Sequence, residues 1–285
     1  MISSTEFKKR LSRIKLIVTD VDGTLTNDKD ELGEDTLYYS KKLQSEKGIK
    51  ITFATQRIHS SIVKYDEQMD ITIPFMTVNG ALIKGLNGTI IFKSVIPPNK
   101  VRKALDLAKY YFVRVALCYN DIILYTEDNS VLKDYMHRIG TDYVLVKDYY
   151  DYLDDVVEII MLGNEKNVIK HIQNKLNFPY KLFLTAKYYR SNSNLGVFHL
   201  EIRKSGTSKK TGLNKIARFL NVKKSEIAVV GDWYNDRELF ECGCLNVAVQ
   251  NAVPEIKHLA HFITKRTNNE DAMGEFLKLV YENTP

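Results

Sequence analysis

Two aspartates stand one residue apart at the end of an apolar stretch, in the segment LIVTDVDGTLT (residues 16–26). Asp and Gly often end strands, so Asp20, Asp22 and Gly23 are compatible with a simple turn. They are equally compatible with chemistry, because one carboxylate can act as a nucleophile while the other transfers a proton. The residues that follow other strands must decide between these two interpretations.

Polar side chains also follow other strand-like segments of the chain. They are Thr55, Gln56 and Arg57 after IKITFA, Asn79 and Gly80 at the end of PFMTVN, Gly231, Asp232, Asn235 and Asp236 after EIAVV, and Lys209 at the start of the helix after FHLEIRK. In an open parallel sheet, ligands bind beyond the carboxyl ends of the strands. We therefore expect these side chains to gather on one rim.

This set of residue types favours phosphoryl chemistry. Carboxylates without a neutralising partner nearby in the sequence are costly to bring together unless a cation joins them. Oxygen ligands without His or Cys suit Mg²⁺ rather than zinc. A divalent cation, a lysine and a hydroxyl can together hold a phosphoryl group, and an aspartate can accept it as an aspartyl-phosphate.

Strand and helix patterns alternate in the segments that would position these residues. Buried strands are predicted at 15–20, 49–54 and 74–79, with helices at 34–47 and 58–68 between them, and Gly48 stands where helices commonly end. After an irregular middle section the pattern returns, with strands at 198–204 and 226–232, short strands in LNVAVQN and HFITK, and helices near 208–222 and 270–282. This alternation predicts a parallel sheet with crossover helices.

The middle section reads as a mixed α+β unit. It contains a hairpin at 81–95, strands near 113–119, 121–127, 156–163 and 181–189, and helices at 97–110, 129–139 and 165–177. We therefore predict an α/β fold, a Rossmann-like parallel-sheet core of residues 1–84 and 190–285 interrupted by an α+β domain of residues 85–189. SNSNLG (191–196) is the predicted return linker.

Composition excludes several classes of partner. The chain has 285 residues and a net charge of +6, and its densest basic run, KKRLSRIK (8–15), is short, so neither a nucleic-acid nor a membrane partner is predicted. No segment reaches the roughly 18 apolar residues of a spanning helix, which favours a cytoplasmic protein. The three cysteines (Cys118, Cys242 and Cys244) fit small buried residues better than disulfides or metal ligands. The oligomeric state is not predicted.

Four segments in order, DVDGT, ATQR, SKKTGL and GDWYND, resemble the four motifs of the haloacid dehalogenase superfamily. The closest resemblance is to its Cof-type phosphatases, which carry a type IIB cap between the second and third motifs. VNGA (78–81), VAVQNAVPEIKHLAHFIT (247–264) and TNNEDAMGEFL (267–277) add to it, so the resemblance extends over essentially the whole chain. The threonine after the two aspartates is the phosphatase-like form of the first motif and disfavours a dehalogenase.

The resemblance implies a role for each motif residue. Asp20 would be the nucleophile, and Asp22 the general acid and base, which also gives its backbone carbonyl to Mg²⁺. Lys209 would orient Asp20 and hold phosphate, and Asp236 would support the metal directly or through water. The implied metal residues are Asp20, Asp22, Asp232 and Asp236; the phosphate-binding residues are Gly23, Thr24, Thr55, Gln56, Lys209 and Asn235; and the substrate contacts are Arg57, Asn79 and Gly80.

Simpler interpretations and departures from the family pattern accompany these roles. Thr55 also fits a helix N-cap, which is compatible with anion binding. Lys210 competes with Lys209 for the motif position, Asp236 also fits a charge favoured by a helix dipole, and Arg57 also fits a structural or solvent-facing residue. Relative to the family pattern, Gln56 replaces the usual glycine of the second motif, and Lys210 replaces the glycine after the motif lysine. Gly212 replaces an alanine, and DAMG (271–274) replaces D-G-V-A. These changes bear on substrate fit and leave every implied catalytic group in place.

The sequence thus predicts a Mg²⁺-dependent phosphatase that hydrolyses small phosphate monoesters, such as sugar phosphates, through an aspartyl-phosphate. The inserted domain would be a cap that excludes water and supplies specificity. A phosphomannomutase-like phosphomutase is one alternative, because DVDGTLT also occurs in those relatives, although GDWYND does not resemble their fourth motif. A non-catalytic module that binds phosphorylated metabolites is the other alternative.

Overall fold

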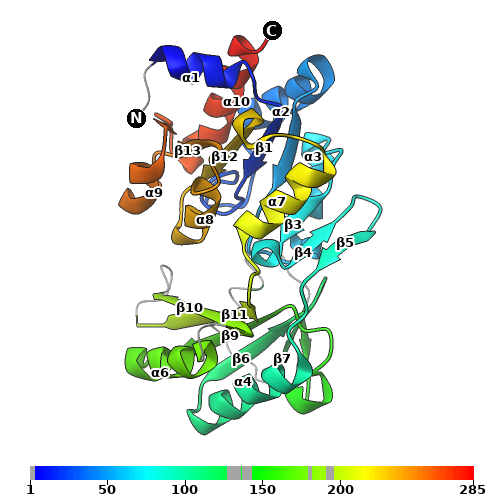
Figure 1. Cartoon of the computed structure of the whole chain (residues 1–285), viewed down its shortest axis with the longest axis vertical. Coiled ribbons are helices and arrows are strands. Elements are labelled where there is room, and N and C mark those ends of the chain that lie inside the picture. The colour runs from blue at the N-terminus through cyan, green and yellow to red at the C-terminus, as the bar shows by residue number, and fades with distance from the viewer. Residues whose placement is uncertain (1–3, 127–135, 137–142, 179–181, 191–195) are drawn as a thin grey trace. The chain divides into compact units, whose positions relative to one another are not determined.

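The computed structural model describes residues 4–126, 136, 143–178, 182–190 and 196–285 (Figure 1). The chain divides into two compact units, each described by itself. The core unit comprises Met1–Gln56, Ile62–Ile91 and Ser208–Pro285, and the second unit comprises Arg57–Ser61 and Phe92–Thr207.

A five-stranded parallel sheet forms the centre of the core unit. Its order is β14 (Phe262–Ile263), β13 (Leu245–Ala248), β12 (Ile227–Gly231), β1 (Leu16–Thr19) and β2 (Lys50–Phe53). In the register, Leu16 stands opposite Ile227 on one side and Lys50 on the other. All four residues of β1 are buried, as expected for a central strand covered on both faces. The parallel arrangement brings the carboxyl ends of the strands to one edge.

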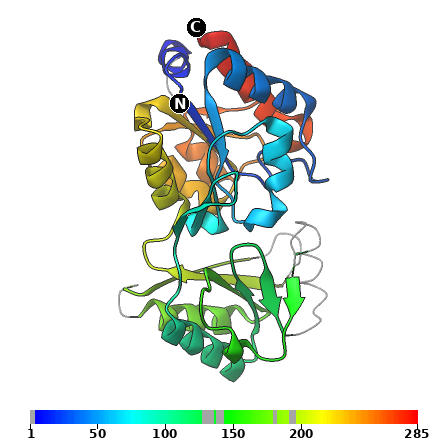
Figure 2. The ribbon, with the colours of Figure 1, turned by 90° about the vertical axis from the view of Figure 1, so that its right-hand side faces the viewer.

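Helices cover both faces of this sheet. Figure 2 shows α2 (Glu34–Lys47) and α10 (Ala272–Asn283) on one side and α7 (Lys209–Phe219) on the other. The remaining elements of the core unit are α1 (Ser4–Leu11), α3 (Val63–Met69), α8 (Arg237–Phe240), α9 (Pro254–Leu259) and the short sheet of β3 (Phe75–Thr77), β4 (Leu82–Lys84) and β5 (Ile90–Lys93), whose last strand extends into the second unit. The α2 helix ends where Gly48 takes a left-handed conformation and donates its N–H to the Leu43 carbonyl.

The second unit is a six-stranded sheet with helices packed on it. Its order is β10 (Leu184–Arg190), β11 (Phe198–Lys204), β9 (Glu158–Gly163), β6 (Arg114–Cys118), β7 (Ile123–Tyr125) and β8 (Tyr143–Leu145). The helices α4 (Pro98–Tyr110) and α6 (Lys166–Asn177) bury Val101, Ile169 and Ile172 in one apolar core with Leu200 and Ile202 of β11. The predicted helix at 129–139 falls almost wholly outside the described residues, as does most of the predicted linker at 191–196.

The strands of the second unit also carry a buried ion-pair triad. The Arg203 Nη1 donates to Glu158 Oε1 at 2.8 Å and to Glu201 Oε2 at 3.2 Å, and all three side chains are at most 5% exposed. Arg203 places positive charge against both buried carboxylates, and buried charges are stable only when they are paired.

The α/β class with a parallel sheet and an inserted α+β unit is confirmed, but two strands were misplaced. The strand predicted at 74–79 contains β3, which pairs antiparallel with β4 in the separate three-stranded sheet rather than joining the parallel core sheet. Residues 198–204 were predicted to belong to the parallel sheet of the core, whereas β11 pairs antiparallel with β9 and β10 in the second unit. The units divide at 91/92 and 207/208 rather than at 84 and 190. The apolar pattern of a strand shows that it is buried and does not show which strands it pairs with.

Several smaller elements also differ from the sequence-based prediction. The helix predicted at 58–68 is a 3₁₀ turn, η1 (His59–Ser61), followed by α3. The elements α1, α8, α9 and β8 were not predicted, because each is short and its periodicity is weak. The three cysteines are free thiols. No helix in the described ranges combines the length and the apolar character needed to cross a bilayer.

Replacement of Arg203 by methionine will destabilise the second unit. The change removes the Arg203 charge and its hydrogen bonds from the buried Glu158 and Glu201, and we expect the free energy of unfolding to fall by about 3–5 kcal/mol. Urea unfolding followed by circular dichroism measures this loss. The matched control is Arg237→Met, because Arg237 is ion-paired but 56% exposed and should contribute less than about 1 kcal/mol. Equal small losses for both variants would contradict the prediction, and Glu158→Gln with Glu201→Gln should restore stability to Arg203→Met.

Candidate active site

The carboxyl ends of β1, β2 and β12 deliver polar residues to one edge of the core sheet. Asp20 directly follows β1, and its N–H donates to the Val230 carbonyl at 3.0 Å. Thr55 follows β2 by two positions, and its N–H donates to the Met76 carbonyl at 3.1 Å. The first bond continues the core sheet beyond β1, and the second joins Thr55 to β3 of the three-stranded sheet. Both side chains therefore extend from hydrogen-bonded backbone.

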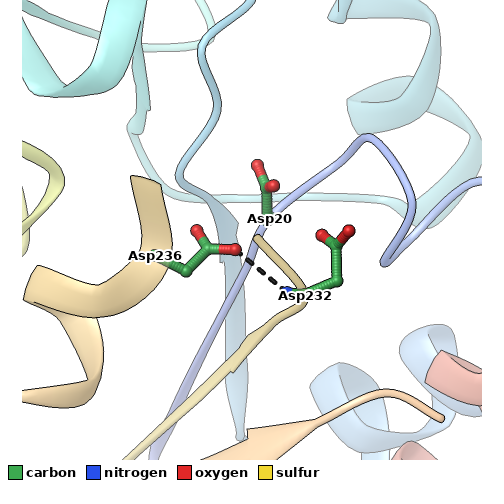
Figure 3. A group of neighbouring side chains, drawn as sticks. All are labelled: Asp20, Asp232 and Asp236. Atoms are coloured by element: carbon green, nitrogen blue, oxygen red, sulfur yellow. Dashed lines mark hydrogen bonds between the residues drawn. The ribbon is translucent and has the colours of Figure 1, made fainter. Parts of the chain in front are cut away.

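Three aspartates meet at this edge (Figure 3). Asp20 comes from the end of β1, Asp232 from the end of β12, and Asp236 from the short turn η5 (Tyr234–Asp236). One carboxylate oxygen from each lies within 4.8 Å of the others, and the three residues are 4%, 7% and 0% exposed, respectively. Such a group of buried oxygen donors can hold a divalent cation.

Lys209 is the counter-charge within this group. It is the first residue of α7, is 1% exposed, and its Nζ lies 2.8 Å from Asp20 Oδ1 and 2.7 Å from Asp236 Oδ1. Burial by itself would lower the pKa of Lys209, but the charges of Asp20 and Asp236 outweigh that effect and raise the pKa. The ammonium therefore stays protonated and fixes the orientation of Asp20.

One lysine cannot neutralise three carboxylates. Burial, followed by the charge of Asp236, raises the pKa of Asp20 to about 7, despite the opposing effect of Lys209. Burial and the charge of Asp20 likewise raise the pKa of Asp232 well above its usual range. A bound divalent cation would offset this remaining negative charge, and an all-oxygen donor set without His or Cys fits Mg²⁺.

The turn after Asp22 is packed directly against Asp232. Thr24 donates from its hydroxyl to Asp232 Oδ1 at 2.7 Å. Gly23 has φ +71°, and a Cβ at this position would lie 2.7 Å from Asp232 Oδ2. Asn251 donates to the Gly23 carbonyl at 2.7 Å. Only glycine fits both the left-handed conformation and this close approach.

Asp236 is held by more than its ion pair. Its Oδ2 accepts the backbone N–H groups of Asp232 at 3.0 Å and of Trp233 at 3.2 Å, while its Oδ1 accepts from Lys209. A Cβ at Gly231 would lie 2.5 Å from this carboxylate. With both oxygens engaged, Asp236 organises the turn that carries Asp232, which goes beyond the simple helix-dipole charge considered from sequence.

Asn79, Gly80 and Asn235 form a second polar group at the same edge. Asn235 donates from its Nδ2 to Asn79 Oδ1 at 3.4 Å, and its own Oδ1 is buried without a hydrogen-bond partner among the described residues. Gly80 has φ +87°, and a Cβ there would lie 2.3 Å from the Ser208 carbonyl oxygen. The glycine thus allows the start of α7, and with it Lys209, to approach this loop.

The remaining predicted site residues differ in their surroundings. Thr55 is fully buried, Gln56 is half-buried, and the Asp22 side chain is exposed and lies outside the aspartate trio. Arg57 belongs to the second unit and is 3% exposed, which removes the solvent-facing interpretation.

The sequence-based prediction missed two residues at this edge, Asn251 and Ser208. Ser208 caps α7 by accepting the Thr211 N–H at 3.3 Å, and S-x-x-T before an apolar pattern was an available signal for it.

Comparison with known proteins places this site in a family. The sequence model of the haloacid dehalogenase-like hydrolases matches residues 17–277, which include every site residue named above. The chain belongs to this family. It is therefore a hydrolase, and the resemblance read from the four motifs is confirmed.

Curated relatives and solved structures agree with this assignment. The chain is 27% identical over 267 residues to 5-amino-6-(5-phospho-D-ribitylamino)uracil phosphatase YitU of Bacillus subtilis, covering 92% of this chain and 96% of that protein. It is 26% identical over 291 residues to phosphatase YwpJ of the same organism, covering 93% and 99%. A haloacid dehalogenase-like hydrolase from Bacteroides thetaiotaomicron superposes with a TM-score of 0.80 at 22% identity, covering 93% and 98%, and shows that the fold is shared.

The crowded carboxylates predict a stability that depends on pH. The pKa of Asp20 rises from 3.8 to about 7 on folding, so the folded protein binds protons more tightly than the unfolded chain. The free energy of unfolding of the metal-free protein should therefore fall as the pH rises from about 4 to about 7. Asp232→Asn removes one repelling charge, and we expect it to reduce this fall by on the order of 1–3 kcal/mol.

Thermal unfolding in a chelating buffer at pH 5 and pH 8 measures this effect. Asp70→Asn is the matched control, because the side chain of Asp70 is 64% exposed and its charge lies in solvent. If wild type, Asp232→Asn and Asp70→Asn lose the same stability between the two pH values, repulsion among the buried carboxylates is not the cause.

Proposed function

We propose that this hydrolase is a Mg²⁺-dependent phosphatase that cleaves small phosphate monoesters through an aspartyl-phosphate. The observation that carries the proposal is the contact of Lys209 with Asp20 inside a buried group of three aspartates. A nucleophilic carboxylate must stay ionised and oriented, and a phosphoryl group needs positive charge around it. The curated relatives that match nearly the whole chain are named phosphatases, which supports the same activity.

Asp20 is the proposed nucleophile. Lys209 holds Oδ1 at 2.8 Å, which leaves Oδ2 to attack phosphorus in line with the leaving oxygen. The bond from Oδ2 to phosphorus forms as the bond from phosphorus to the ester oxygen breaks. A water molecule then attacks phosphorus, the aspartyl-phosphate bond breaks, and inorganic phosphate is released with the Asp20 carboxylate restored.

Asp22 is the proposed general acid and base. It lies two residues beyond Asp20, and its exposed side chain is outside the trio, so it remains accessible to a substrate. In the first step it protonates the leaving ester oxygen, and in the second it takes a proton from the attacking water. This division gives each aspartate of the first motif one task.

The phosphoryl oxygens require donors in addition to Lys209. Thr55 supplies a fully buried hydroxyl at the end of β2, and the backbone at Gly23 and Thr24 can meet the phosphate. Asn235 lies beside Asn79 at the same edge and can supply an amide, whereas Gln56 is a further phosphate contact implied by its motif. We assign Mg²⁺ to Asp20, Asp232, the Asp22 backbone carbonyl and the supporting Asp236, where it would neutralise the charge of the phosphoryl group.

The second unit is the proposed cap, and the name of a curated relative supports the proposed substrate class. Inserted between the second and third motifs, the unit is the part of the chain available to recognise the leaving group and exclude water. The relative YitU is named for a phosphorylated ribityl compound, a small metabolite phosphate ester. We extend that class, including sugar phosphates, to this enzyme, with Arg57, Asn79 and Gly80 as candidate substrate contacts.

Phosphate release from an aryl phosphate with Mg²⁺ tests the activity. We expect turnover that stops on chelation, returns with Mg²⁺, and falls at least about 10³-fold in Asp20→Asn. Asp70→Asn should retain wild-type activity because its carboxylate is exposed. Release from wild type no faster than from Asp20→Asn, across a panel of phosphate esters, would refute the proposal. Isomerisation of a hexose phosphate without net phosphate release would identify a phosphomutase, and tight binding without turnover a binding module.

The role of Asp22 predicts a burst. Nitrophenolate leaves without a proton, so Asp22→Asn should still form the aspartyl-phosphate from p-nitrophenyl phosphate but hydrolyse it slowly. Rapid mixing should then show about one nitrophenol released per active site, followed by a steady rate at least about 10²-fold below wild type. An alkyl phosphate should give no burst. Equal losses on both substrates without a burst would assign Asp22 a different role.

A further inference from the structure

The chain passes between the two units at an unexpected place, immediately after the Thr55 loop. Residues 57–61 group with the second unit, although Gln56 and Ile62 on either side belong to the core unit. The crossings at 91/92 and 207/208 are those that any inserted unit requires, whereas the excursion of 57–61 is additional. We call this five-residue segment the strap.

Thr55 is fixed to the core unit on the near side of the strap. Its N–H donates to the Met76 carbonyl at 3.1 Å, and its carbonyl accepts the Asn79 N–H at 2.9 Å. The preceding residue, Ala54, donates to the Thr19 carbonyl at 2.9 Å. Both backbone polar groups of Thr55 are therefore held by β3 and the turn that follows it in the core unit.

The strap itself is fixed within the second unit. The His59 N–H donates to the Asn120 carbonyl at 3.4 Å, and the Ser60 hydroxyl donates to the Asp121 carbonyl at 3.1 Å. These two carbonyls belong to the turn between β6 and β7. Ser61 donates from its hydroxyl to the Ile58 carbonyl at 2.9 Å, which closes the strap into a compact turn.

The connection between the two anchored points is short. Only Gln56, Arg57 and Ile58 separate Thr55 from His59, a span of at most about 14 Å when fully extended. Arg57 and Ile58 are each 3% exposed. The φ angle of Gln56 is not positive, so this residue is not in the left-handed region. Its side chain also restricts the backbone more than a glycine would. A displacement of the strap must therefore be absorbed within very few bonds or passed to Thr55.

We propose that the strap positions Thr55, and that Ser60 is the positioning residue that ties it to the second unit. The hydroxyl of Thr55 is then placed for phosphate only when the strap is seated on the β6–β7 turn. The second unit thereby influences phosphate binding itself, separately from any contact it makes with a leaving group. The inference rests on the proposed function, because it takes Thr55 as a phosphate ligand.

Inhibition by inorganic phosphate tests this role, because phosphate has no leaving group for the second unit to recognise. Ser60→Ala removes the bond to the Asp121 carbonyl, and we expect the inhibition constant to rise about three- to tenfold, the range for one net hydrogen bond. Ser60→Thr keeps a hydroxyl and should restore the wild-type constant. Ser45→Ala is the matched control, since its hydroxyl makes a similar bond, to the Lys41 carbonyl at 2.8 Å, on the exposed α2 helix of the core unit.

A double-mutant cycle distinguishes positioning from local damage. Gln56→Gly loosens the connection between strap and Thr55, so Ser60→Ala should have little further effect on phosphate inhibition in that background. A merely structural role in the second unit would give additive effects, because loosening residue 56 would not alter it. Thermal unfolding of each variant shows that the protein being compared is folded.

Each outcome bears on one claim. An active wild type whose phosphate inhibition is unchanged in Ser60→Ala overturns the strap proposal and leaves the phosphatase intact. The strap proposal is also overturned if Ser60→Ala raises only the KM of substrates with large leaving groups, because the substitution would then act on leaving-group recognition and not on phosphate binding. Additive effects in the cycle also overturn it. An inactive wild type instead overturns the proposed function on which the inference rests.

Discussion

Three buried carboxylates share one lysine ammonium, and the core unit is arranged around this imbalance of charge. Asp20, Asp232 and Asp236 lie within a few ångströms of one another with almost no solvent contact. Repulsion in such a space is strong because water cannot screen it. The rigid ends of two parallel strands and the capped start of α7 hold the groups together against that repulsion. An unfavourable arrangement retained in a stable fold is typical of a site that binds a cation and an anionic substrate.

Glycines supply the close approaches that this arrangement needs. Gly23 lets the first-motif turn come against Asp232, and Gly80 lets the loop after β3 come against the start of α7. At each of these positions a side chain would collide with the neighbouring segment of the site. Each glycine also has a positive φ, which other residues rarely adopt. In the proposed mechanism aspartates and a lysine carry the chemistry, and these glycines allow the segments that bear them to approach one another.

The junctions between the two units lie close along the chain to residues of the proposed active site. Along the chain, residues 57–61 begin two residues after Thr55, and the second unit ends two residues before Lys209. Relatives at 26–27% identity match this chain over almost its full length. At that distance a family and a reaction type are supported, while the residues that select one metabolite can differ.

The sequence by itself determined the chemistry and the class of fold. Asp20, Lys209 and Asp232 could be selected from residue type and from position at a strand end, because an open parallel sheet brings those ends to one edge. Thr55 and Asn235 were found at strand ends in the same way, and the family motifs added their phosphate-binding roles. Helix limits such as Glu34–Lys47 also followed from local signals, since Gly48 ends that helix.

Only the tertiary structure decided which distant segments meet. Strand 198–204 has the same apolar pattern wherever it pairs, and its place in the second unit depends on the backbone partners of β9 and β10. The placement of the strap also depends on the tertiary structure. Gln56 and Arg57 are adjacent in sequence, yet they belong to different units. Local sequence records how buried a residue is and what chemistry it can perform. Which segments lie beside it depends on the packing of the whole chain.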